Sequence, residues 1–116
     1  MSKWTAQGTA AESAICRTLN ANGFEGVERR AKQGKNDRGD IAGIRRTVIE
    51  AKSGKQYHIA PWLEEADWEA SNDNDAPIRV VWFKIPGFSD PMNWPVMMRG
   101  KLFVPMLHNY LANGGI

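Results

Sequence analysis

Two carboxylates and one amine lie at a spacing that suits metal-assisted chemistry: Asp40, Glu50 and Lys52. Side chains alternate along a β-strand, so Glu50 and Lys52 would project from one face while Ile49 and Ala51 face the other way. A hairpin could bring Asp40 beside that polar face. Two converging carboxylates would bind a hard divalent cation such as Mg²⁺. The amine would orient or deprotonate a water and offset charge developing on a phosphate.

A Glu50–Lys52 ion pair on a solvated strand face is the competing interpretation, because such pairs are common and stabilise little. This interpretation does not explain why Asp40 stands at the head of the preceding predicted strand. The spacing alone supports the two interpretations about equally.

The hydrophobic pattern predicts the elements that would position these residues. Apolar side chains recur every four positions across residues 11–19, which predicts a helix over residues 9–21 that ends at Gly23. Turn-forming residues fill the polar loop at residues 32–39. Strands are predicted at residues 24–31, 40–44 and 47–52, the last two joined tightly near Arg45 and Arg46.

The second half of the chain continues this alternation of helices and strands. Pro61 suits the first turn of a helix that runs to about Ala70, and residues 78–85 are expected to form a buried central strand. A loop at 86–95, a strand within 97–104 and a helix over 105–112, ended by Gly114-Gly115, complete the prediction. The order αβββαβ, followed by a strand and a helix, predicts one mixed α/β domain over residues 1–116.

The run Gly-Asp-Ile-Ala around Asp40, followed by Glu50-Ala51-Lys52, resembles the signature of the PD-(D/E)xK nuclease superfamily. That signature is an Asp followed by a Glu-x-Lys on the next strand. With a glutamate on the upstream helix, Glu12, the chain is most similar to the Holliday-junction resolvases of archaeal and phage type. The resemblance implies a restriction-endonuclease-like domain, with a mixed central sheet flanked by helices, that hydrolyses DNA with Mg²⁺ or Mn²⁺.

The resemblance also assigns roles, over a match that covers roughly residues 9–85. Asp40 and Glu50 would be metal ligands, with the backbone carbonyl of Ala51 as a third. Lys52 would be the water-activating or charge-stabilising group. Glu12 would reach the metal directly or through a water.

Glu12 has a second interpretation that the sequence leaves open. Thr9-Ala10-Ala11-Glu12 matches a capping box, in which the glutamate would satisfy the N-terminus of the helix. The chain also departs from the cellular resolvases, which often place a serine before the metal-binding aspartate. The loop at residues 32–39 contains no serine. Lys35 or Asn36 could contact a phosphate there instead, and the departure bears on junction specificity more than on nuclease chemistry.

Basic residues gather around the predicted site. Residues 1–60 carry eleven Lys and Arg against six Asp and Glu, whereas residues 61–116 carry four against seven. Beside a nuclease motif, these cations are better interpreted as phosphate contacts than as solubilising charge. The residues expected to contact DNA, with the polar Gln56 as the weakest candidate, are Arg29, Arg30, Lys32, Lys35, Arg38, Arg45, Arg46, Lys55 and Gln56.

Other chemistries find little support in the sequence. One cysteine and two distant histidines, His58 and His108, cannot form a structural zinc site. Gly34-Lys35 and Gly54-Lys55 lack the upstream glycine and the Ser/Thr of a phosphate-binding P-loop. The tryptophans could stack on bases, but in a small domain they are expected in the core. Trp68 is the exception, because it lies off the apolar face of its predicted helix.

The composition fits a small intracellular domain with a modest core. The single Cys16 excludes an intramolecular disulfide, and the first eight residues lack the apolar run of a signal peptide. A cytoplasmic location is therefore expected, which would be the host cytoplasm if the chain is phage-encoded.

The remaining expectations concern assembly, alternative functions and membranes. A homodimer is expected, because symmetric cleavage of a four-way DNA junction needs two active sites. Met97, Met98, Leu102 and Phe103 could supply its interface or could equally be core residues. The rival functions are a nuclease for linear, flap or single-stranded DNA, an inactive DNA-binding module of the same fold, and a protein-interaction domain. No segment is apolar enough to suggest a membrane span.

Overall fold

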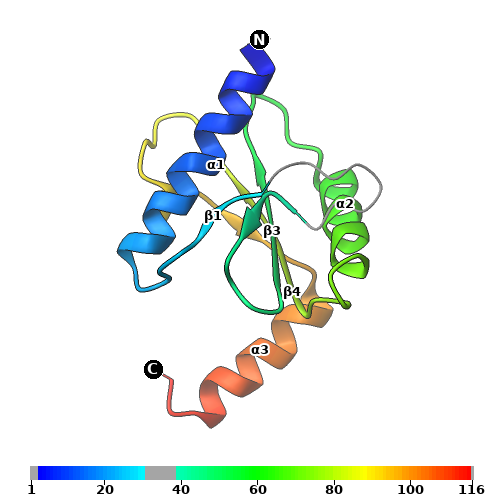
Figure 1. The fold of residues 1–116 in the computed structure, drawn as a ribbon. Helices are drawn as coiled ribbons and strands as arrows, with labels where there is room; N and C mark the ends of the chain where they lie inside the picture. Colours follow the sequence, from blue (N-terminus) through cyan, green and yellow to red (C-terminus); the bar gives the residue numbers. More distant parts are fainter. Residues whose placement is uncertain (1–2, 31–38, 116) are drawn as a thin grey trace.

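A mixed three-stranded sheet lies at the centre of the structure, a computed structural model that describes residues 3–30 and 39–115 (Figure 1). Its order is β3 (Thr47–Lys52), β4 (Ile78–Phe83) and β5 (Val96–Met97). Strands β3 and β4 are parallel and β5 is antiparallel to β4. Helix α2 (Ile59–Ser71) connects the two parallel strands. A parallel pair needs such a crossover, because a tight turn cannot return the chain to the same edge. Strand β4 is therefore central, as predicted.

Helices α1 (Lys3–Ala21) and α2 cover opposite faces of this sheet (Figure 1). On the α1 face, Ile15 packs in one cluster with Ile49 and Ala51. On the α2 face, Trp62 packs with Val81 in a separate cluster. Alternate residues of each strand therefore face different helices, as the period of two along a strand requires. Thus Ile49 and Ala51 of β3 face α1, whereas Val48, Glu50 and Lys52 face α2.

A separate two-stranded sheet forms where the sequence predicted a longer hairpin. Strand β1 (Glu28–Arg29) pairs antiparallel with β2 (Ile41–Ala42). The prediction that strands 40–44 and 47–52 form a paired hairpin is wrong, because β2 pairs with β1 instead. A turn that includes Arg46, whose φ is +57°, separates β2 from β3. The chain segment before β2 nevertheless touches β3, since the Asp40 N–H donates to the Ile49 carbonyl at 3.1 Å.

The first two helices differ from the prediction mainly in their starts. Helix α1 begins at Lys3, six residues before the predicted start, so Thr9 lies inside the helix. The capping-box interpretation is therefore wrong, because Thr9 and its neighbours are not at a helix N-terminus. Helix α2 begins at Ile59 and keeps Pro61 in its first turn, as predicted.

The C-terminal segment contains the largest error of the prediction. Strand β5 ends at Met97, and residues 100–104, predicted as strand, open helix α3 (Gly100–Ala112). The apolar and aromatic side chains in this segment are compatible with a strand or a helix. In the structure, the N–H groups of Leu102 and Phe103 donate to the Arg99 carbonyl and start the helix. Pro105 lies inside α3 rather than at its start.

Helix α3 points away from the sheet and has no buried residue (Figure 1). Of the predicted interface residues, Phe103 is exposed and Leu102 is half-buried. Met98 packs against the cluster beneath α1, and Met97 packs against that beneath α2. None of the described helices is long and apolar enough to cross a membrane.

Candidate functional site

Strand β3 carries two of the predicted site residues, and both point toward helix α2. Glu50 is fully buried, whereas the Lys52 side chain is partly exposed. The Lys52 ammonium lies 3.8 Å from a Glu50 oxygen, within ion-pair range but too far for a hydrogen bond. The alternation expected along this strand is thus confirmed. The solvated-face interpretation is wrong for Glu50, because its carboxyl group has no contact with solvent.

Asp40 lies directly beside this strand and is held by main-chain hydrogen bonds. Its N–H donates to the Ile49 carbonyl, and its own carbonyl accepts from the Arg30 N–H at 2.8 Å. The carboxylate oxygen Oδ2 accepts the Ala51 N–H at 2.9 Å. This bond fixes the orientation of the Asp40 carboxylate against β3. The sequence therefore predicted the proximity of Asp40 to Glu50 correctly, although the hairpin that was to produce it is absent.

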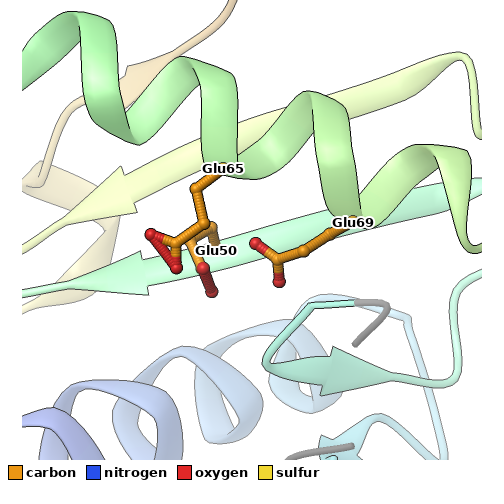
Figure 2. A group of neighbouring side chains, drawn as sticks. All are labelled: Glu50, Glu65 and Glu69. Carbon is orange, nitrogen blue, oxygen red and sulfur yellow. The ribbon is translucent and has the colours of Figure 1, made fainter. Parts of the chain in front are cut away.

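Helix α2 adds two glutamates that the sequence analysis missed, Glu65 and Glu69 (Figure 2). One carboxylate oxygen from each, together with one from Glu50, lie within 4.8 Å of one another. Residues four apart share one face of a helix, so the spacing of the two glutamates aims both at β3. The available signal was the four-residue spacing of Glu65 and Glu69 within the predicted helix, which places both on one helix face.

The electrostatics of Glu50 are dominated by its burial and by its acidic neighbours. Burial raises the pKa of Glu50 far above its usual range, and hydrogen bonds with Asp40, Glu65 and Glu69 raise it further. Carboxyl groups can bond to one another in this way only when one of them holds a proton. Neither oxygen of an ionised Glu50 has a donor among the described residues. The cluster could therefore bind a metal ion, which would take the place of that proton.

Lys52 is bound more closely to α2 than to its own strand. Its ammonium donates to both oxygens of Glu65, at 2.7 and 3.1 Å. Burial alone would lower the pKa of Lys52, but the hydrogen bond with Glu65 and the charge of Glu50 outweigh it and raise the pKa. Lys52 is therefore an ammonium at neutral pH.

The structure gives Glu12 an arginine partner, and its predicted contact with the metal stays a prediction. Helix α1 packs on the Ile49 and Ala51 side of β3, whereas Glu50 points to the opposite side. The Glu12 carboxylate instead pairs with Arg29 Nε at 3.0 Å. Glu12 is not a member of the three-glutamate cluster. No bound group tests the Ala51 carbonyl as a ligand, so that role remains a prediction.

The predicted DNA contacts fall into three groups. Lys32, Lys35 and Arg38 lie outside the described residues, as does Asn36. Arg29 forms an ion pair with Glu12. Arg30 is partly buried, and its Nε has no hydrogen-bond partner among the described residues. The remaining side chains are exposed and available to a ligand: Arg45, Arg46, Lys55 and Gln56.

The aromatic residues follow the prediction where the structure describes their side chains. Trp62, Trp82 and Trp94 are buried, and Trp68 is exposed on α2. His58 is exposed and lies edge-on to Trp62, which agrees with a surface packing role. Comparison of the chain with protein-family models, with curated proteins and with solved structures finds no match.

Proposed function

We propose that this chain is a metal-dependent endonuclease that hydrolyses phosphodiester bonds in DNA, with Mg²⁺ as its cation and Mn²⁺ as a substitute. The observation that carries the proposal is the buried Glu50 carboxyl group. This group lies beside Asp40, and neither of its oxygens has a hydrogen-bond donor among the described residues. The Lys52 ammonium lies 3.8 Å from one of these oxygens. Buried acidic oxygens without donors are costly unless a proton or a cation joins them.

Asp40 and Glu50 fit a hard divalent cation by their chemistry. Both offer carboxylate oxygens, the ligands that Mg²⁺ prefers. The Ala51 N–H holds the Asp40 carboxylate in place, so this ligand is oriented before a cation arrives. When bound there, Mg²⁺ would polarise a phosphoryl oxygen and lower the pKa of a bound water.

Lys52 contributes positive charge rather than a base. Because Glu65 and Glu50 raise its pKa, the side chain keeps its proton at neutral pH. An ammonium can donate hydrogen bonds to a phosphate oxygen and to the attacking water, and it stabilises the negative charge that develops on the phosphate. Of the two roles implied by the resemblance, charge stabilisation is therefore the one that we assign to Lys52.

DNA is the proposed substrate because exposed cations lie on the connections at both ends of β3. Arg45 and Arg46 precede the strand, and Lys55 follows it beside the polar, uncharged Gln56. Cations near a catalytic site attract the phosphate backbone and release its counterions. We further propose that the fold is restriction-endonuclease-like and that a four-way junction, cut by a homodimer, is the preferred substrate.

A cleavage assay tests the proposal. The full chain is incubated with a four-way junction, a flap, a linear duplex and a single strand, each with Mg²⁺ or with EDTA. We expect paired symmetric nicks in the junction that require Mg²⁺ and that disappear in the Asp40→Asn variant. Glu64→Gln, an exposed position on α2, serves as the matched control and should cleave normally.

The rival functions correspond to other results of the same assay. Cleavage of linear, flap or single-stranded DNA with no preference for junctions would replace the resolvase proposal by a general nuclease. Tight DNA binding without cleavage in Mg²⁺, Mn²⁺ or Ca²⁺ would identify an inactive binding module and overturn the enzyme proposal.

A further inference from the structure

We propose that Glu65 and Glu69 of helix α2, together with Glu50 of β3, form a second divalent-cation position beside the one at Asp40. This inference rests on the proposed nuclease function and names a part of its site that neither the motif nor the sequence analysis assigned. Glu50 would be the carboxylate that the two positions share.

The geometry of the three glutamates suits one cation. Their closest oxygens all lie within 4.8 Å of one another, and Figure 2 shows the three carboxylates converging between α2 and β3. Oxygens around one cation are at most about twice the metal–oxygen distance apart, roughly 4.2 Å for Mg²⁺ and roughly 4.6–5.2 Å for Ca²⁺. The bound of 4.8 Å is within the limit for Ca²⁺ and slightly above that for Mg²⁺. A small closing movement of the partly exposed Glu65 would suit the smaller ion.

A second observation points to a ligand independently of the clustering. Glu50 is fully buried, and neither of its oxygens accepts a hydrogen bond from a described residue. The nearest described ammonium, that of Lys52, lies 3.8 Å away and donates instead to Glu65. Buried carboxylates are normally satisfied by several donors. An ionised Glu50 carboxylate is thus aimed into the cluster without a hydrogen-bond donor among the described residues.

The proposed position is distinct from the one at Asp40. The Asp40 carboxylate is oriented by the Ala51 N–H and is not a member of the three-glutamate cluster. Glu50 has two oxygens and neighbours both Asp40 and the two glutamates of helix α2, so it can serve both positions. Paired cations in hydrolytic sites lie about 3.5–4 Å apart. A shared carboxylate is the simplest way to hold them at that separation.

Cation binding at this position would also change the partner of Lys52. Glu65 now binds the Lys52 ammonium through both of its oxygens. A Glu65 oxygen that turns to a cation leaves the ammonium with fewer acceptors. Lys52 would then be available to a phosphate, so that the second cation and the substrate would favour each other's binding.

Calorimetric titration with Mn²⁺ alone, without DNA, tests the second position directly. We expect the wild-type chain to bind two Mn²⁺ ions and the Glu69→Gln and Glu65→Gln variants to bind one. Asp40→Asn should also bind one, because it keeps the position on α2. The matched control Glu64→Gln, on the same helix but exposed, should still bind two. Circular dichroism and thermal unfolding establish that each variant is folded, and the partly exposed Glu65 provides a usable variant if Glu69→Gln does not fold.

The titration separates failure of this inference from failure of the proposed function. The wild type could bind a single Mn²⁺ that is lost in Asp40→Asn and keeps its affinity in both α2 variants. This result would overturn the second position and leave the nuclease proposal intact. No Mn²⁺ bound by the wild type at millimolar concentration would overturn both. A loss of one ion, or a tenfold loss of affinity, in Glu65→Gln and Glu69→Gln but not in Glu64→Gln would support the inference.

Discussion

The ammonium of Lys52 lies 2.7 Å from a carboxylate oxygen of Glu65, closer than it lies to Glu50 on its own strand. Although burial lowers the pKa of Lys52, Glu65 of helix α2, together with Glu50 and Asp40, raises it above the usual value. An ion pair of this kind keeps the amine charged and limits it to donating hydrogen bonds.

The first prediction concerns Lys52. Replacement by Met should lower kcat by roughly 10²–10³-fold, the usual loss when one donor to a developing negative charge is removed. Because the pKa of Lys52 is raised, the Mg²⁺-dependent rate should show no inflection from its deprotonation between pH 7 and 9. Rates measured across this range for wild type and Lys52→Arg check this. A rate that rises through pH 8–9 in the wild type but not in Lys52→Arg would make Lys52 a base.

The second prediction concerns the stability of the metal-free protein. Burial and three carboxyl neighbours raise the pKa of Glu50 above its unfolded value of 4.5. The folded state therefore keeps a proton that the unfolded chain releases near that pH, so stability falls as pH rises above about 4.5. In EDTA, we expect the Tm of the wild type to fall between pH 5 and pH 8. The fall in Glu50→Gln should be smaller by about 4 °C or more. Mn²⁺ at pH 8 should raise the Tm of wild type.

Equal pH dependence of the two Tm values would show that the Glu50 carboxyl group ionises without cost in the folded state. The same comparison with Glu64→Gln, whose position is exposed, controls for the loss of one acidic group. Its pH dependence should match that of the wild type.

The sequence was sufficient for the parts of the site that depend on local geometry. The alternation of Glu50 and Lys52 with Ile49 and Ala51 determines which side chains share a face, because that pattern has a period of two wherever the strand lies. Which helix covers the polar face is a long-range property, decided by the β3–α2–β4 crossover. The family resemblance therefore pointed to a third carboxylate at Glu12 on α1, whereas Glu65 and Glu69 of α2 are the glutamates that cluster with Glu50.

The segment after β5 shows the same limit for secondary structure. Residues 97–104 are apolar, and a short apolar run suits a strand or a helix equally well. The start of α3 at Gly100 gave no clear signal, since its N-cap residue Arg99 makes no side-chain capping hydrogen bond. Pro105, which commonly opens a helix, favoured the wrong boundary.

The third prediction concerns Gly39, which precedes the proposed metal ligand Asp40. Its φ is +98°, and a Cβ there would lie 3.1 Å from Val48 Cγ1 and 3.3 Å from the Ile49 carbonyl oxygen. Gly39→Ala should therefore destabilise the fold by about 1–2 kcal/mol. It should also displace Asp40 and lower kcat by roughly 10²-fold, as small misplacements of a reacting group do. Urea unfolding and cleavage rates measure the two effects.

Gly100 offers a matched control for that substitution. It opens helix α3, and a Cβ added there would meet no atom within 4 Å and would require no positive φ. Gly100→Ala should leave both stability and cleavage close to wild type. If Gly39→Ala were equally harmless, the position of Asp40 would not depend on the close packing of Gly39 against Val48 and Ile49.

The fourth prediction is that α3 forms a homodimer interface. Its exposed stripe consists of Phe103, Leu107, Tyr110 and Leu111, which recur at helical spacing on one side. Apolar side chains gathered on one exposed helix face mark a site of protein association.

A second copy fits this stripe better than a charged partner. The described α3 carries Lys101 as its one Lys, Arg, Asp or Glu residue, so the helix offers little for electrostatic recognition. Light scattering coupled to size exclusion should give a dimer mass at micromolar concentration, and Leu107→Asp should give a monomer. Asn109→Asp adds the same charge on the opposite side of the helix and should remain dimeric. A wild-type chain that is monomeric at all concentrations would leave α3 without this role and would require each junction nick to be made independently.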